Sequence, residues 1–167
     1  MLRPHNSFVS ITLLAFVGVL TAGCFNGQNA QTSQQVTEPT GNGAQVTVEA
    51  IRVDNATLVA GPNGSNSATL LVRIVNQGND VDTLVGAEVG GEAAFITNES
   101  TELLPGSSIS FGFNSDLWIN AYDFDSEVSS YVPVSLTFEK SGDADLSVLV
   151  VPATGYYEGI APEPPVA

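Results

Sequence analysis

Three carboxylates alternate with other residues in one short stretch, and they are the first candidates for chemistry in this chain. Asp123, Asp125 and Glu127 project to the same side if the stretch is extended. Carboxylate oxygens are the ligands that Ca²⁺ takes, and a carboxylate pair can also do acid or base work. The stretch lacks the glycine and the spacing of an EF-hand loop, and a solvated acidic loop is the commoner meaning of such a run. We therefore keep calcium binding as an alternative and expect no catalytic residue here.

Imidazole bases and soft metal ligands are almost absent from the chain. The single Met, His and Cys residues are Met1, His5 and Cys24, all close to the amino terminus. Catalysis of the Ser-His-Asp or Cys-His kind requires an imidazole base. Selective binding of Cu(I) requires thioether, thiolate or imidazole ligands. The sequence therefore predicts a protein that is not an enzyme, with no cofactor and no metal site beyond the calcium alternative.

Cys24 closes an apolar run that has the layout of a secretory signal. Arg3 precedes the run, residues 8–20 are mostly apolar, and Leu20-Thr-Ala-Gly-Cys24 follows. This stretch resembles the lipobox of bacterial lipoproteins, which implies removal of residues 1–23 and attachment of a diacylglyceryl group to the Cys24 sulfur. The alternatives are an ordinary signal with an accidental cysteine and an uncleaved anchor, but the run is shorter than the roughly 20 residues that cross a bilayer.

The charge balance restricts the partners. The chain has 18 acidic residues, four Lys or Arg residues and a formal net charge of −14. Such a field repels phosphate backbones and anionic headgroups, so we expect no nucleic-acid partner. Membrane attachment must then come from the lipid on Cys24, which places the protein on the extracytoplasmic face of the cell membrane. Solubility outside the cell explains the acidity more simply than an acidic binding function does.

The composition divides the chain into four parts. Residues 1–23 form the signal peptide, and residues 24–44, rich in Asn, Gln, Thr, Ser and Gly, form a flexible tether. Residues 45–152 are long enough for one domain with its own core. Residues 153–167 form an acidic tail rich in proline, which we expect to be disordered beyond Gly155 except for docking of Tyr156 and Tyr157. With one cysteine, no disulfide within the chain is expected.

The folded part reads as short strands separated by turn residues. Alternating apolar and polar residues predict strands at 46–50, 68–75 and 134–138, and further runs lie at 81–89 and 93–97. Near Glu49 the alternation changes phase, because the apolar residues move from even to odd positions. Ile109, Phe111 and Phe113 form the apolar parity of another strand. Residues 144–151 are apolar on both parities, which suggests a strand covered on both sides and ended by Pro152. This spacing predicts an all-β fold, an antiparallel sandwich or barrel.

Several segments in order resemble the PCu(A)C family of periplasmic copper chaperones, and most closely its lipoprotein branch. The likeness covers about residues 45–152 and implies a cupredoxin-like antiparallel β-sandwich with Greek key connections. The segments that carry it are Val53-Asp54-Asn55-Ala56, residues 68–76 followed by Gly78, Asp80, Asp82, Leu84 and Val85, then Leu104-Pro105-Gly106, Val134-Ser-Leu-Thr-Phe-Glu-Lys-Ser-Gly142 and Leu149-Val-Val-Pro152.

The same resemblance indicates where copper ligands would stand. The family binds copper through His and Met side chains, and the corresponding positions here are approximately residues 95–101 and 117–120. Neither interval contains a His or a Met. The resemblance therefore implies a protein that keeps the fold and binds no copper.

Trp118 stands near the place where the family has its second pair of copper ligands. With Leu117 and Tyr122 it forms a candidate aromatic and apolar patch for a protein or glycan partner of the cell envelope. The alternative is that Trp118 anchors the core. The sequence thus predicts a lipid-anchored envelope protein that acts as a binding or structural module. The alternative function is a metal-handling lipoprotein that uses carboxylates for copper or calcium.

Overall fold

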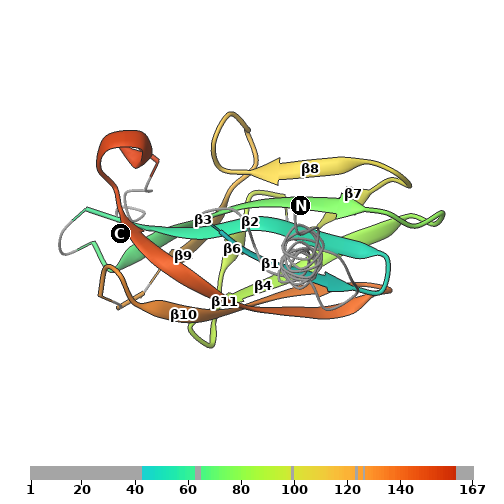
Figure 1. The fold of residues 1–167 in the computed structure, drawn as a ribbon, viewed down its shortest axis with the longest axis horizontal. Coiled ribbons are helices and arrows are strands. Elements are labelled where there is room, and N and C mark those ends of the chain that lie inside the picture. Colours follow the sequence, from blue (N-terminus) through green and yellow to red (C-terminus); the bar gives the residue numbers. More distant parts are fainter. Residues whose placement is uncertain (1–42, 63–64, 99, 123, 126, 161–167) are drawn as a thin grey trace, which may run out of the picture. The chain divides into compact units, whose positions relative to one another are not determined.

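The structure, a computed structural model, describes residues 43–160 apart from positions 63, 64, 99, 123 and 126. This part is built almost entirely of strands (Figure 1). In these described residues the strands are β1 (Ala44–Val48), β2 (Ile51–Ala60), β3 (Ser67–Asn76), β4 (Asp82–Val89), β5 (Glu92–Ala93), β6 (Phe95–Ile96), β7 (Thr101–Leu103), β8 (Ser108–Phe111), β9 (Ile119–Tyr122), β10 (Tyr131–Phe138) and β11 (Gly142–Pro152), followed by a 3₁₀ turn, η2 (Gly155–Tyr157).

Two sheets form the sandwich, and β11 belongs to both. In the first sheet, β4 pairs with β5, β7 and β10, and β10 pairs with the first part of β11. In the second sheet, β2 lies between β3 and the end of β11, β8 and β9 both pair with β3, and β6 pairs with β9. The chain passes from one sheet to the other between β3 and β4, at each step from β5 to β8, and again between β9 and β10. The predicted cupredoxin-like β-sandwich is confirmed, although one pairing, β11 with β2, is parallel.

The apolar parities predicted from the sequence face the core. Ala68, Leu70 and Ile74 on β3 are fully buried, and Leu136 on β10 is too. On β11 the residues at 144, 146, 148 and 150 are buried, whereas Leu149 and Val151 are half-buried. The strand is therefore covered fully on one face and partly on the other.

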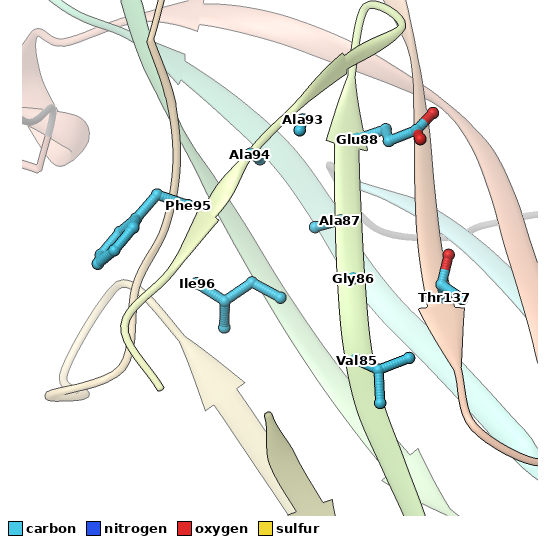
Figure 2. A pocket seen from close by; sticks show the side chains of 9 residues that line it. All are labelled: Val85, Gly86, Ala87, Glu88, Ala93, Ala94, Phe95, Ile96 and Thr137. Carbon is cyan, nitrogen blue, oxygen red and sulfur yellow. The ribbon is translucent and has the colours of Figure 1, made fainter. Parts of the chain in front are cut away.

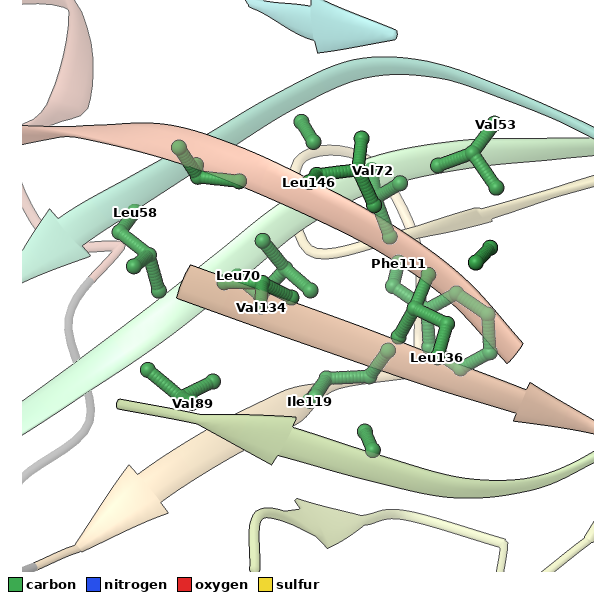
Figure 3. Close-up of a cluster of buried hydrophobic side chains, with 14 of the residues drawn as sticks. Val53, Leu58, Leu70, Val72, Val89, Phe111, Ile119, Val134, Leu136 and Leu146 are labelled. Carbon is green, nitrogen blue, oxygen red and sulfur yellow. The ribbon is translucent and has the colours of Figure 1, made fainter. Parts of the chain in front are cut away.

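The core lies between the two sheets (Figure 3). Side chains from the inner faces of both sheets fill it, and burial of this apolar surface is the main force that holds the sandwich together. Its largest fully buried members are Phe111, Ile51, Leu58, Leu70, Ile74, Leu84, Leu103, Ile119 and Leu136.

The phase change near Glu49 is a hairpin turn. Val48 pairs with Ile51, so Glu49 and Ala50 are the two turn residues, and Glu49 has a φ of 47°. A two-residue hairpin needs such angles because they match the twist of the flanking strands. The sequence hid this turn because neither residue is a glycine or an asparagine.

The prediction for Phe113 was wrong. Gly112, with a φ of 91°, ends β8, and Phe113 is exposed to 44% of its surface. The Phe113 side chain does not point into the core, because the chain turns at Gly112 instead of continuing as a strand.

The folded part also extends further than predicted. β1 begins at Ala44, and beyond Pro152 the chain continues through η2 to Ile160, which is buried. The Thr69 hydroxyl lies 3.4 Å from the Ile160 carbonyl oxygen and donates to it. The expected docking of Tyr156 and Tyr157 is confirmed, and the expected disorder is wrong for residues 158–160. The signal peptide, Cys24, the tether up to residue 42 and the prolines of the tail lie outside the described residues.

None of the helical segments within the described ranges is long and apolar enough to cross a bilayer.

Candidate functional site

Parts of the two intervals that the sequence resemblance assigned to copper ligands lie side by side, at the edge formed by β6 and β9. Phe95 pairs with Asn120, and Ile96 pairs with Ile119. Beyond the ladder, the Thr97 amide donates to the Trp118 carbonyl oxygen at 2.9 Å. The Trp118 amide in turn donates to the Thr97 hydroxyl oxygen at 2.8 Å. We call this place the β6–β9 edge.

The side chains at the β6–β9 edge alternate between the core and the outside. Ile119 and Ala121 are buried, whereas Trp118 and Tyr122 are half-buried and lie at the alternate positions of the strand. Phe95 is 53% exposed. The structure therefore places Trp118 and Tyr122 off the core face of β9, and Trp118 is not a core anchor.

Leu117 differs from its neighbours. It is partly buried and packs against the core cluster, so its side chain faces inward. Because Phe95 pairs with Asn120, the structure places Phe95 on the same face as Trp118 and Tyr122, and the sequence did not single out Phe95 as a site residue. Phe95 could be found only once the pairing of β6 with β9 was known.

The β6–β9 edge offers rings, hydroxyls and an amide, and no soft donor. The Asn120 side-chain oxygen already accepts a hydrogen bond from the Thr69 hydroxyl at 3.0 Å. Within the described ranges no group of three His, Cys, Asp or Glu residues is placed to hold a metal ion. Cu(I) prefers sulfur and imidazole ligands, which these side chains do not supply.

A groove of about 400 Å³ lies beside this edge, between β4 and the segment that carries β5 and β6 (Figure 2). The Ala94 amide still donates to the Ala87 carbonyl oxygen at 2.8 Å, and after it the chain leaves β4 to pair with β9. Figure 2 shows Ile96 turned towards β4 and Phe95 turned away from it. The groove is lined by Val85, Gly86, Ala87, Glu88, Ala93, Ala94, Phe95, Ile96 and Thr137.

The acidic stretch before β10 is only partly described. Phe124 is buried, and its amide donates to the Asn66 carbonyl oxygen at 2.8 Å. Asp125 and Glu127 are exposed, and Asp123 lies outside the described residues. Calcium binding by Asp123, Asp125 and Glu127 thus stays a prediction.

Asp82 is the buried carboxylate of the described part, with 4% of its surface exposed. Its oxygens accept hydrogen bonds from the amides of Thr83, Lys140 and Ser141, and from the Ser141 hydroxyl at 2.6 Å. Burial alone would raise the pKa of this carboxyl, but the four hydrogen bonds outweigh burial and lower the pKa. Asp82 joins the start of β4 to the β10–β11 turn, so its role is structural.

Comparison with known proteins agrees with this fold. No family model matches the sequence, and no curated protein matches it either. Among solved structures, a copper-bound PCuAC domain from PmoF2 is 20% identical, with a TM-score of 0.59, and the match covers 65% of this chain and 97% of that one. An apo PCuAC domain from PmoF1 is 22% identical, with a TM-score of 0.56, and the match covers 64% of this chain and 97% of that one.

The sandwich therefore has the fold of the PCuAC domains, as the resemblance in the sequence implied. At this level of identity the likeness concerns the fold, and function has to be argued from the side chains.

Proposed function

We propose that this protein is a lipid-anchored, extracytoplasmic module of the bacterial cell envelope that keeps the PCuAC fold, has lost copper binding and acts by binding a partner rather than by catalysis. One observation supports the proposed loss of copper binding. The two intervals where the family has its ligands are adjacent at the β6–β9 edge, and they present Phe95, Thr97, Trp118 and Asn120 in place of His and Met.

The aromatic character of this edge supports a binding role. Phe95 is more than half exposed, and Trp118 and Tyr122 are half-buried on the neighbouring strand. Aromatic side chains at a surface supply much of the binding free energy in protein interfaces. We assign the partner-facing role to Trp118, Tyr122 and Phe95, and we leave Leu117 to the core.

The sequence supports the anchor. The stretch that ends in Cys24 has the residues of a lipobox, and the strong acidity leaves the lipid as the means of attachment.

A metal titration tests the loss of copper. The mature chain, residues 24–167, carrying Cys24→Ser so that it holds no thiol, is titrated with Cu(I) in the presence of a competing chelator, and separately with Cu(II) and Ca²⁺, by calorimetry. We expect no stoichiometric binding of copper. Tight stoichiometric copper binding would overturn the proposal.

The alternative function, metal handling by carboxylates, is favoured by the fold and by the exposed Asp125 and Glu127. We would accept this alternative if the protein bound Ca²⁺ stoichiometrically and the double variant Asp125→Asn, Glu127→Gln did not. That result would contradict the proposal that the protein binds no metal.

A further inference from the structure

The segment after β11 creates a second surface that the sequence did not indicate. η2 carries Tyr156 and Tyr157 next to the loop that follows β8 (red segment in Figure 1). The rings of Phe113 and Tyr156 stack with their centroids 5.1 Å apart, and Tyr157 meets Tyr156 edge to face at 5.3 Å. Phe113 is 44% exposed and Tyr156 is 70% exposed. Two large rings therefore stand at the surface in a fixed arrangement.

These rings form one wall of a cleft of about 300 Å³, which we call the aromatic cleft. Its other wall and floor come from β2, β3 and β8. The polar side chains of the cleft are those of Asn55, Thr57, Arg73, Ser110, Tyr156 and Tyr157. A concave site with apolar faces and a few convergent polar groups is the usual form of a small-molecule site.

The charge of the aromatic cleft differs from that of the chain. The chain has a formal net charge of −14, yet no acidic residue lines the cleft and Arg73 does. Arg73 donates from Nη2 to the Ser108 hydroxyl at 3.1 Å. Among the described residues, the ion pair that is found joins Arg52 and Asp54, at 3.0 Å. Asp54 lies across from Arg73 in the β2–β3 ladder, but its carboxylate is paired with Arg52. The Arg73 guanidinium donates to a neutral hydroxyl and can also donate to a carboxylate bound in the cleft.

We propose that the aromatic cleft binds an acidic saccharide. The flat apolar face of a pyranose ring packs on the exposed rings of Phe113 and Tyr156. The sugar hydroxyls bond to Asn55 and to the hydroxyl groups of the cleft, and the sugar carboxylate pairs with Arg73. The volume suits one or two sugar rings, which favours a saccharide over the larger footprint of a protein partner.

This inference goes beyond the proposed function. The aromatic cleft uses residues other than those of the β6–β9 edge, and it depends neither on the lipid nor on the loss of copper. If no saccharide binds, the proposed loss of copper binding still stands. If copper binds, the proposed saccharide site still stands.

The test uses the mature protein purified after expression of the full-length chain, with calorimetric titration of three probes. Tetragalacturonate is the acidic saccharide, cellotetraose is the neutral one, and tetraglutamate is an acidic peptide. We expect tetragalacturonate to bind and to bind more tightly than the other two. Arg73→Gln weakens tetragalacturonate about tenfold or more and removes its advantage over cellotetraose, because the charge-assisted hydrogen bonds are lost.

Two aromatic variants separate the cleft from a general effect of surface rings. Tyr156→Ala weakens both saccharides, whereas Tyr131→Ala, which removes a tyrosine that is 68% exposed on β10, leaves both affinities unchanged. Circular dichroism confirms that each variant is folded. Absence of saccharide binding by the wild type, tighter binding of tetraglutamate, or equal effects of the two tyrosine variants would overturn the proposal.

Discussion

At the scale of single residues, the buried polar groups are the sharpest determinants of stability. Asp82 and Asn76 are both buried and both fully engaged. The Asn76 amide group donates to the carbonyl oxygens of Asp80 and Leu103, and its oxygen accepts from the Gly78 amide. These hydrogen bonds hold the loop between β3 and β4 in place. Removing one partner would leave the other buried polar groups without hydrogen bonds, which is costly.

Asp82→Asn should destabilise the protein by about 2 kcal/mol at neutral pH, because an amide NH₂ would replace an oxygen that now accepts hydrogen bonds. The lowered pKa of Asp82 means that its contribution is complete above the ordinary value of 3.8 and is lost as pH falls through the lower folded pKa. Urea unfolding from pH 7 to pH 2 should therefore show a smaller loss at acid pH in the variant than in the wild type.

The control for this change is Asp80→Asn, which alters an exposed carboxylate in the same loop. An Asp80→Asn protein with the same loss and the same pH profile would show that Asp82 has no special role.

Thr101→Val should raise the free energy of unfolding by about 1 kcal/mol, since the Thr101 hydroxyl is buried and has no hydrogen-bond partner among the described residues. Thr69→Val is the matched control: Thr69 is also buried, but its hydroxyl donates to Asn120, so the same change should destabilise. Denaturant unfolding of the two variants gives the comparison, and effects of the same sign would contradict it.

At the scale of elements, Gly112 decides where β8 ends and where Phe113 points. A Cβ built at Gly112 would lie 2.2 Å from Leu71 Cδ2, and the residue has a φ of 91°. The glycine thus allows the loop to cross closely over β3 and to deliver Phe113 to the aromatic cleft.

Gly112→Ala should cost about 2 to 4 kcal/mol, through backbone strain and the clash with Leu71 together. Gly91→Ala isolates the strain, because Gly91 has a similar φ of 88° and nothing within 4 Å of the added atom. Thermal unfolding should place Gly112→Ala clearly below Gly91→Ala, and equal midpoints would mean that the contact with Leu71 is easily relieved.

The strands that the sequence predicted well are those with strict alternation, such as β3 and β10, because their two faces meet different surroundings. The turn at Glu49 showed in the sequence only as a change of pattern, because a hairpin turn with positive φ is usually signalled by glycine or asparagine, and the exposure of Phe113 escaped prediction because it depends on the positive φ of Gly112. The resemblance pointed to residues 95–101 and 117–120 as one functional region, but their pairing along β6 and β9 came only from the structure. The aromatic cleft did not, because Arg73, Phe113 and Tyr156 are distant in sequence and no periodic pattern connects them.

At the scale of the whole molecule, fold and charge together define the proposal. The sandwich has the fold of the PCuAC domains, and aromatic and neutral side chains stand at its β6–β9 edge, where we propose that copper binding has been lost. In the function that we propose, the acidity keeps the protein soluble and the lipid on Cys24 provides the membrane attachment.

Cys24→Ser should move the protein from the membrane fraction to the soluble extracytoplasmic fraction or the medium, since acyl chains supply the anchoring free energy. Metabolic labelling with a fatty acid and fractionation measure this. Thr21→Ser is the control, because it changes a neighbouring residue and keeps Cys24. We expect this variant to be labelled and to stay in the membrane fraction. Membrane retention of Cys24→Ser without label would contradict the anchor.

The double membership of β11 has a consequence for export. In the described part, the hydrogen-bonded path from β10 to β2 runs through β11, the last strand to be synthesised. The hydrogen-bonded ladder that connects the two sheets therefore cannot be completed until β11 has emerged, and pairing of such distant segments is slow. A polypeptide that must be threaded unfolded through a translocation channel, as we propose for this one, gains from that delay because it stays export-competent until its final strand arrives.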